Sequence, residues 1–443
     1  MNHITKPLTA LLTAAFISTG IYAQTNGSNS SYSRFGMGML SDQSQGANRS
    51  MGGVAQGLRS GNRLNMLNPA SYAAIDSLSF IFDIGMSMQR TAMKQAGTKL
   101  HVNNTSIDFV NAGFRIQPGL GMSIGFVPLT SIGYAFSQEQ KVGVDDYTQQ
   151  NITRTSNFTG SGGLHQIYAG VGWETTKHLS IGANIGFLWG NVNHALTTAY
   201  AENSTNNSSY NTPNSLENAS LKTWKADIGL QYQKATGIED FLTIGATVGI
   251  GHDVGGDATL LRFVSNGDSV TQVANKPYQL PMTYSIGFAW QHRKQWTLAA
   301  DYTLEQWGNC TAPAMETGAT ALDIRYVAAE GSYSDRHKVS IGAEYVPKAR
   351  SNSYGKRISY RMGASYATPY LKINGEDGPK ELALTAGIGL PILNRWNSRS
   401  CLNIGVQWVH REPSVSNMIT ENYFRLNLGV TFNDQWFKKW QFK

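Results

Sequence analysis

The stretch Leu78-Ser-Phe-Ile-Phe-Asp-Ile-Gly-Met-Ser-Met88 decides the fold class of this 443-residue chain. Its alternate positions, from Leu78 to Met88, are apolar, whereas the positions between them are mostly small or polar. Because successive side chains of a β-strand leave opposite faces, this period of two predicts a strand with one apolar face. The same pattern returns in the segments that begin at Leu179, Leu242, Val339, Leu402 and Phe424. The chain is therefore expected to be all-β.

A soluble β-sandwich uses the same alternation, so the period alone leaves two architectures open. Two further features favour a barrel in a bacterial outer membrane. An export signal begins the chain, and the polar face of the strands is rich in glycine and carries scattered charges. An apolar outer face with a polar inner face is the inverted pattern of a transmembrane barrel. We predict a single 14-stranded antiparallel transmembrane β-barrel over residues 77–432 with an N-terminal plug.

Residues 1–23 have the features of a secretory signal peptide. Lys6 supplies a positive charge, a short apolar core runs from Leu8 to Tyr22, and Ala23 precedes a plausible cleavage site. No run of 18 apolar residues follows this segment, so no spanning helix is expected. The formal net charge of +7 is modest for the length and spread along the chain, which does not suggest a nucleic-acid partner.

The alternation delimits fourteen strand segments, and an even number suits a bacterial single-chain barrel. They are 77–90, 105–117, 121–137, 164–174, 178–199, 219–233, 241–262, 282–292, 296–307, 335–346, 358–370, 380–390, 400–410 and 420–432. Short and long connections alternate between them, as periplasmic turns and external loops do. This asymmetry predicts that both termini lie in the periplasm, with an aromatic and basic tail over residues 433–443 at the inner interface.

Two other features follow from this topology. Residues 24–76 lack the strand pattern and are rich in Gly, Ser and Asn, so we expect a leader followed by a plug in the lumen. Cys310 and Cys401 fall at opposite ends of the barrel, so they are expected to be free thiols.

The N-terminal region resembles a known family. The run Gly46-Ala-Asn-Arg-Ser-Met-Gly-Gly, the tripeptide Asn68-Pro69-Ala70 and the following strand are similar to the hatch of FadL-type long-chain fatty acid transporters. The segment from Gly119 to Tyr134 is similar to the third strand of that family, and the segment that starts at Ser31 resembles outer-membrane proteins of Bacteroidota. The resemblance implies a fourteen-stranded barrel with a plug. The same hatch signature also occurs in barrels that serve protein secretion or envelope assembly.

The sequence offers no support for catalysis or for a cofactor. Ser123 lies in the pattern Gly121-Met-Ser-Ile-Gly125, but that nucleophile motif requires a turn from a strand to a helix, whereas Ser123 falls inside a continuous strand pattern. The nine histidines show no metal-binding spacing. We therefore predict a protein that is not an enzyme and has no metal site.

Charged residues recur on the inward phase of the strands. They are Asp83, Arg115, Lys225, Asp227, Asp301, Glu344, Arg361 and Arg425. A selectivity ring would be one interpretation. Because both signs are present, we favour a polar lumen in which these charges pair with one another and with the plug.

Pro128 is the residue that most directly suggests a transport route. Proline cannot donate to a strand ladder, yet the strand over 121–137 should lie between two others. Phe126, Val127, Pro128 and Leu129 therefore form a candidate lateral opening, as an inward kink of the third strand does in the fatty acid transporters. A bulge without any role in transport is the alternative.

These observations lead to two functional hypotheses. The first is passive uptake of a hydrophobic small molecule that passes the plug and leaves sideways into the outer-membrane lipids. The second is an accessory barrel of a larger envelope assembly or secretion complex, which would have a protein partner and would transport nothing.

Overall fold

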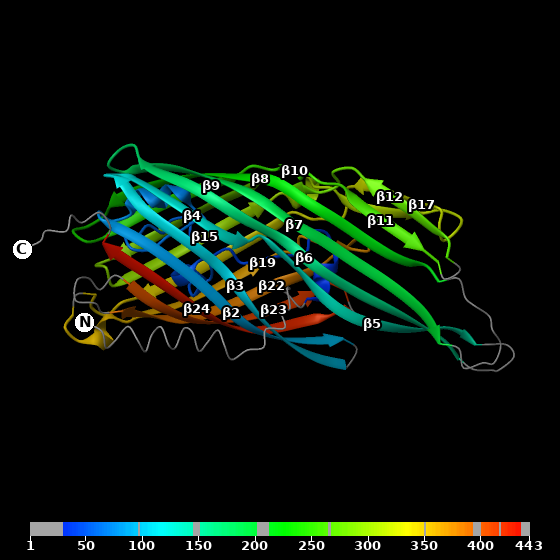
Figure 1. Ribbon diagram of the computed structural model, residues 1–443. Coiled ribbons are helices and arrows are strands. Elements are labelled where there is room, and N and C mark those ends of the chain that lie inside the picture. Colours follow the sequence, from blue (N-terminus) through cyan, green and yellow to red (C-terminus); the bar gives the residue numbers. More distant parts are fainter. Residues whose placement is uncertain are drawn as a thin grey trace, which may run out of the picture.

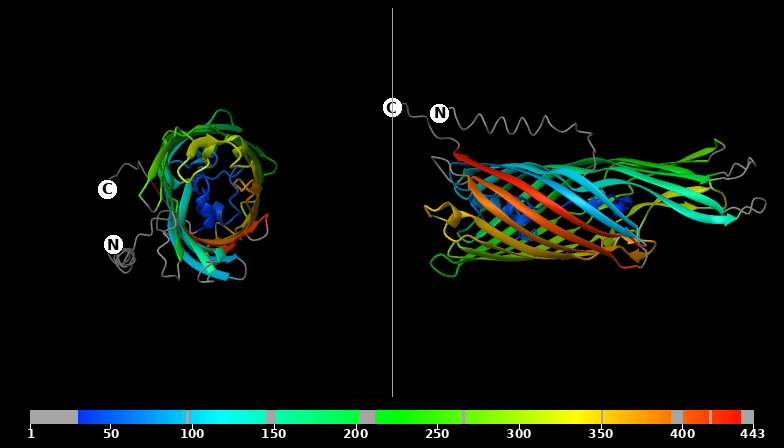
Figure 2. Two further views of the ribbon diagram at one scale, coloured as in Figure 1. Left: turned by 90° about the vertical axis from the view of Figure 1, so that its right-hand side faces the viewer. Right: turned by 90° about the horizontal axis from the view of Figure 1, so that it is seen from below.

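In the computed structural model, one closed ring of antiparallel strands surrounds an N-terminal segment, seen in dark blue inside the ring (Figure 1; Figure 2, left). The structure describes residues 30–95, 98–144, 151–201, 212–264, 267–349, 351–392, 400–415 and 418–435. The expected signal peptide and the tail from Trp436 onward lie outside the described residues. Over the described ranges, no helix combines the length and apolar character that crossing a membrane requires.

Fourteen strand positions close the ring, as the alternation predicted. One position is divided into two strands, β4 and β5, which follow each other along the wall. The positions are β2 (Ser79–Gln95), β3 (Thr98–Gln117), β4 (Leu120–Pro128) with β5 (Thr130–Val144), β6 (Asn151–Glu174), β7 (Leu179–Ala201), β8 (Asn214–Ala235), β9 (Phe241–Gly249), β14 (Thr283–His292), β15 (Trp296–Glu305), β18 (Arg336–Tyr345), β19 (Ser359–Ala367), β22 (Pro379–Ile392), β23 (Ser400–Pro413) and β24 (Thr420–Gln435). The ring closes where β24 pairs with β2.

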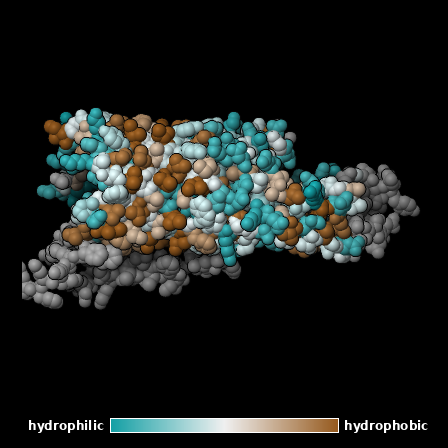
Figure 3. Space-filling model, turned by 90° about the horizontal axis from the view of Figure 1, so that it is seen from above, coloured by the Kyte–Doolittle hydropathy of each residue, from teal (hydrophilic) through white to brown (hydrophobic). Residues whose placement is uncertain are grey.

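Side chains alternate across the wall as a transmembrane barrel requires. On β2, Ile84, Met86 and Met88 are exposed, whereas Asp83 and Ser87 are buried toward the lumen. Figure 3 shows apolar residues spread over the outer face of the barrel body. Apolar residues on the outer phase of the alternating strands are exposed or half-exposed, among them Leu78, Phe80, Ile244, Val248, Leu426 and Val430.

The expected strand over 241–262 is wrong as one element. β9 ends at Gly249, and the chain then forms β10 (His252–Asp253) and β11 (Ala258–Phe263), the latter on the outer part of β8. Gly256 explains part of the break, because its φ is +122° and a Cβ there would lie 2.2 Å from the Ser220 carbonyl oxygen. A left-handed backbone in close contact with a neighbouring strand requires glycine and interrupts a regular ladder.

The two ends of the barrel differ. At one end, called here the short-turn end, β-hairpins such as β14–β15 join through tight turns. At the other, the long-loop end, β6, β7 and β8 extend beyond the rest of the wall (Figure 1). The connections there form further small strands: β12 (Ser269–Ala274), β13 (Gln279–Leu280), β16 (Ala312–Thr317), β17 (Ile324–Ala329), β20 (Lys372–Ile373) and β21 (Glu376–Asp377).

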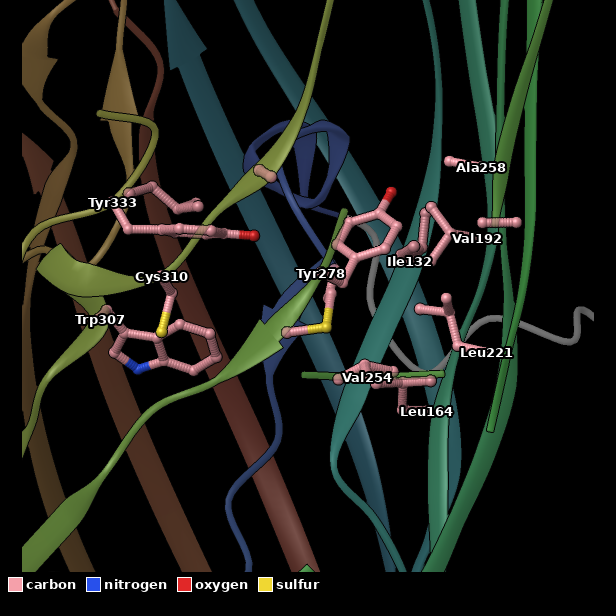
Figure 4. Packing of buried hydrophobic residues seen from close by; sticks show 14 of the residues in the cluster. Ile132, Leu164, Val192, Leu221, Val254, Ala258, Tyr278, Trp307, Cys310 and Tyr333 are labelled. Carbon is pink, nitrogen blue, oxygen red and sulfur yellow. The ribbon is translucent and has the colours of Figure 1, made fainter. Parts of the chain in front are cut away.

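A large apolar core fills the lumen toward the long-loop end. Loop residues Tyr278, Trp307 and Tyr333 pack there with wall residues such as Ile132 and Leu221 (Figure 4). Tyr32, Met37 and Met39 of the N-terminal segment join the same cluster. The interior of this half of the barrel is therefore protein packed against protein.

Residues 30–76, called the luminal segment, run inside the ring. They contain the 3₁₀-helix η1 (Ser31–Arg34), the strand β1 (Met39–Leu40), the α-helix α2 (Gly46–Arg49) and the 3₁₀-helix η2 (Pro69–Ala74). Ser30 donates to the carboxylate of Glu421 at the start of β24, whereas the last described residue is at the far end of that strand. The first and last described residues thus lie at opposite ends of the barrel, while the expected mature terminus at Gln24 lies outside the described ranges.

Candidate functional site

The wall is interrupted where the third strand position is divided. β3 pairs with β4 from Val110 opposite Phe126 to Gln117 opposite Leu120. Over its outer part, 98–109, β3 pairs only with β2, while β5 pairs with β6 on its other side. Within the described residues, β3 and β5 are therefore not paired with each other, and we call this unpaired interval the wall break. The two strands diverge toward the long-loop end in Figure 1.

Pro128 ends β4 at this break, where it lies opposite His165 of β6. The backbone groups that follow it bond to β6 as well as to the luminal segment, since the Leu129 amide donates to the Leu164 carbonyl at 2.8 Å. Leu129 accepts a hydrogen bond of 2.9 Å from the Ser41 amide, and Thr130 pairs in register with Leu40 of β1. Since an unpaired backbone group facing lipid is costly, these bonds explain how a proline can stand in this wall.

Apolar and aromatic side chains surround the break on both faces. On the outer face, Phe126 stacks on His165 at a centroid distance of 5.6 Å and lies 6.1 Å from Trp189. On the inner face, Val127 is fully buried in a cluster with Met66 and Tyr168. The four residues predicted to line a lateral opening thus lie beside the break, which is backed by the luminal segment.

The tripeptide Asn68-Pro69-Ala70 lies against the inner wall. Asn68 is completely buried, and its side-chain oxygen accepts from the Ala70 amide at 3.2 Å, which caps η2. Wall glycines make this close contact possible, because a Cβ at Gly182 would lie 2.4 Å from the Pro69 carbonyl carbon. A Cβ at Gly229 would lie 2.3 Å from the Asn68 oxygen. Any larger residue at these two positions would displace η2.

Arginines attach the luminal segment to the wall at several heights. Arg63 forms a bidentate contact with Glu344 at 2.6 and 2.7 Å, and Arg361 donates to the same carboxylate at 2.7 Å. Arg49 pairs with Asp108, a side chain at the bulge of β3, and is itself almost fully buried. Bidentate charge-assisted bonds are stronger and more directional than neutral ones, so these contacts fix the position of the segment.

Most of the predicted inward charges have a partner inside the barrel or are buried in the lumen. Asp301 accepts from the Ala55 and Gln56 amides, Lys225 pairs with Asp227, and Arg425 donates to Gln89. Asp83, Glu344 and Arg361 are buried in the lumen, the first accepting from Thr431. Arg115 is the exception, because it lies partly exposed near the short-turn end, where it donates to Ser77.

Two cavities of about 270 and 230 Å³ are lined in part by the luminal segment. The second, which we call the central cavity, is lined by acids and bases of both signs, including Asp42, Asp301, Arg336 and Arg411. Burial alone would raise the pKa of the Asp42 carboxyl, but Arg49 and Lys338 lower that pKa to about 2. Asp42 is therefore ionised at neutral pH and holds one side of the Arg49 guanidinium.

The serine, cysteine and metal-ligand candidates of the sequence can now be placed in the structure. Ser123 lies within β4 and donates to the Ala112 carbonyl, so the strand-to-helix turn of a nucleophile motif is missing at this serine. Cys310 and Cys401 are both free thiols, as their separation predicted. Across the described ranges, His, Cys, Asp and Glu side chains form no group of three that could hold a metal ion.

Sequence reasoning missed the arginines of the luminal segment. Arg49, Arg59 and Arg63 fall in a region without any strand pattern, and Arg59 reaches Glu174 on β6 at 2.7 Å. One feature of the sequence could have predicted them. Buried carboxylates on the inner wall need cationic partners, and these three arginines of the expected plug lie within fifteen residues of one another.

Comparison with known proteins agrees with this geometry. A family model described as BamG matches residues 4–443. No curated protein matches the chain. A structure described as the CymD monoaromatic hydrocarbon channel is 14% identical with a TM-score of 0.58, and covers 89% of this chain and 99% of its own.

Two further structures show the same fold. The Pseudomonas putida toluene transporter TodX is 17% identical with a TM-score of 0.54, covering 89% of this chain and 99% of its own. A Pseudomonas aeruginosa FadL homologue is 10% identical with a TM-score of 0.57, covering 90% and 99%. At these identities the likeness concerns the fold, which is that of FadL-type channels, and none of these structures is described as an enzyme.

Proposed function

This chain belongs to the BamG family, and from its FadL-type fold we propose that it is an outer-membrane channel for passive entry of hydrophobic small molecules. The observation that carries this proposal is the wall break beside Pro128. A gap in a barrel wall with apolar and aromatic rims suits a hydrophobic solute that leaves into the membrane and suits a polar solute poorly. CymD and TodX, which have this fold, are described as a monoaromatic hydrocarbon channel and a toluene transporter.

The luminal segment would be the plug of this channel. Its arginine contacts hold it across the lumen, and Met66 contributes to the apolar cluster behind Val127. A small displacement of this part of the segment would connect the lumen with the wall break. Diffusion would supply the driving force, because no cofactor or energy source is needed to move an apolar solute into lipid.

A second function is favoured by a different observation. Charged, amide and hydroxyl side chains form most of the lining of both cavities beside the luminal segment, and the long-loop half of the lumen is packed by the apolar core. A barrel closed in this way would suit an accessory role in a larger envelope assembly, in which it binds a protein partner and transports nothing.

One experiment separates the two functions. The protein is purified from native membranes in a mild detergent, and bound lipids and proteins are identified together by mass spectrometry. A hydrophobic compound bound at stoichiometric level, lost when Val127 is replaced by Asp, would support the channel. A stable protein partner without such a compound would contradict it and support the accessory role. Val406→Asp, on the lipid face of β23 away from the break, controls for general disturbance of the barrel.

A further inference from the structure

The cavity of about 270 Å³ at the short-turn end is strongly basic, and we call it the basic cavity. Five cationic side chains line it against a single acid. They are Arg59, Arg63, Lys294, Arg357 and Arg361, and the acid is Glu344. The protein as a whole has a formal net charge of only +7, so this small volume holds a disproportionate share of the positive charge.

Internal pairing does not account for all of this charge. Arg63 and Arg361 share Glu344, and Arg59 pairs with Glu174 outside the lining. Lys294 and Arg357 have no ion pair within the described residues, and the buried Nε of Arg357 has no hydrogen-bond partner there. A buried donor that is left unsatisfied is costly, so the Arg357 guanidinium retains a hydrogen-bonding capacity that a ligand could use.

The backbone at Lys294 gives an independent indication. Arg293 and Lys294 both have positive φ, +48° and +53°, in the turn between β14 and β15. Two successive left-handed residues in a hairpin strongly favour Asn-Gly or Gly-Gly, because a side chain with a Cβ is strained there. Two long basic residues occupy this turn instead, and strain retained in a tight turn is a common mark of a functional position.

The neighbouring connection, whose Val346 amide donates to the Gln295 carbonyl at 2.8 Å, carries the same charge. Arg357 ends η4 (Tyr354–Arg357) in the connection 346–358, which holds four basic residues and no acid. This connection joins β18 to β19, whereas Lys294 belongs to the turn before β15. The unpaired cations therefore come from separate elements, which fits a ligand with several separated negative charges better than one small anion.

The surroundings of the cavity indicate the class of ligand. The wall is continuously paired from β14 to β24 in the described residues, so a lipid headgroup cannot reach the cavity from the side. Carboxamide side chains also line it, among them Asn62, Gln233 and Gln291. Carboxamides both donate and accept hydrogen bonds, so they can pair with the backbone of a polypeptide.

We infer that the basic cavity binds an acidic, extended polypeptide segment of a partner protein that enters from the short-turn end. The cations would bind its carboxylates and the carboxamides its backbone. This site is separate from the wall break, so it does not depend on whether the barrel transports hydrophobic compounds.

Binding of a fluorescent peptide to the full-length protein in neutral detergent tests this inference. The probe is a short peptide with four consecutive glutamates, and the same peptide with glutamines serves as its uncharged counterpart. We expect saturable binding of the glutamate peptide alone, weakened at least about tenfold in the double variant Lys294→Gln with Arg357→Gln and weakened by added salt. Migration of the unheated barrel on a gel shows that each variant is folded.

Lys276→Gln is the matched control, because Lys276 is also an exposed lysine with positive φ but lies at the long-loop end. It should bind the glutamate peptide as the unmodified protein does. Absence of binding, or equal binding by the double variant, would overturn the inference. Displacement of the peptide by inorganic phosphate at equal concentration would also overturn it, since the site would then be one for simple anions.

Discussion

At the scale of single residues, the wall break depends on one proline and on the luminal segment, which bonds the residue that follows it. Pro128 cannot donate, and the following carbonyl of Leu129 is bonded by Ser41 from inside the barrel. The luminal segment thus completes the wall where the strand pairing is interrupted. A substitution at Pro128 or in the luminal segment near Ser41 should therefore change both the position of the segment and the width of the wall break.

Pro128→Val should reduce the uptake of a hydrophobic compound while the barrel still folds. Valine restores the amide donor and has a high strand propensity, so β4 can continue into β5 and narrow the gap. Uptake of a radiolabelled hydrophobic probe by cells that produce each variant measures the effect. Pro313→Val, in the outer hairpin strand β16, is the control and should leave uptake unchanged. Equal uptake rates for Pro128→Val and the unmodified protein would show that solute does not leave there.

Asp42 predicts how acid affects the luminal segment. Its pKa of about 2 lies below the ordinary value of about 3.9, so its stabilising contribution is complete above pH 4 and is lost as the pH falls toward 2. We expect the conductance of single barrels in planar bilayers to rise over that interval. Asp42→Asn should show raised conductance already at pH 7 and a smaller acid response, whereas Asp253→Asn, at an exposed position of the short strand β10, should behave as the unmodified protein. An unchanged acid response in Asp42→Asn would exclude this role.

At the scale of elements, the wall and its contents differ in how well the sequence predicts them. Strand alternation is local, so the run from Leu78 to Met88 identifies β2 without any other information. The segment 241–262 was misjudged because two alternating runs flank Gly251, Gly255 and Gly256 and resemble one long strand. The three glycines are the sequence feature from which the end of β9 could have been predicted. The signal peptide over 1–23 and the tail from Trp436 onward stay predictions, whereas 433–435, which we assigned to the tail, belong to β24.

The contacts of the luminal segment could not be predicted in this way. Arg63 and Glu344 are separated by 281 positions along the chain, and only closure of the ring brings them together. The hatch resemblance indicated where Asn68-Pro69-Ala70 would lie, but the wall glycines that receive η2 have the same sequence context as other strand glycines. Prediction therefore reached the elements of the wall and missed the pairings that hold the interior, while the lateral opening at Pro128 stays a prediction.

Deleting residues 24–70 should leave a barrel that inserts and conducts ions freely. Outside the wall break, where β5 pairs with β1 of the luminal segment, each strand bonds to its neighbours around the ring and needs no luminal partner. Conductance in planar bilayers should rise severalfold above that of the unmodified protein. Asn68→Ala, which retains the segment, is the control and should conduct far less than the deletion. If the deletion conducts no more than the unmodified protein, the luminal segment does not act as a plug.

At the scale of the whole molecule, the two ends of the barrel have different chemistry. The long-loop end is filled by the apolar core, whereas the short-turn end opens on the basic cavity. A molecule closed at one end and charged at the other is suited to face different compartments. Its orientation in the membrane thus decides whether the basic cavity meets periplasmic proteins, as an acidic partner segment would require.

Cysteine labelling determines that orientation. We expect short turns in the periplasm and long loops outside, as in other single-chain barrels. In a background with Cys310→Ala and Cys401→Ala, Lys276→Cys should react with a membrane-impermeant maleimide in intact cells, because Lys276 is exposed at the long-loop end. Ile238→Cys, at a fully exposed position in the turn between β8 and β9, should react only after the outer membrane is permeabilised. The reverse pattern would place the basic cavity outside the cell, where a periplasmic partner could not reach it, and the luminal segment would then enter the barrel from the periplasm.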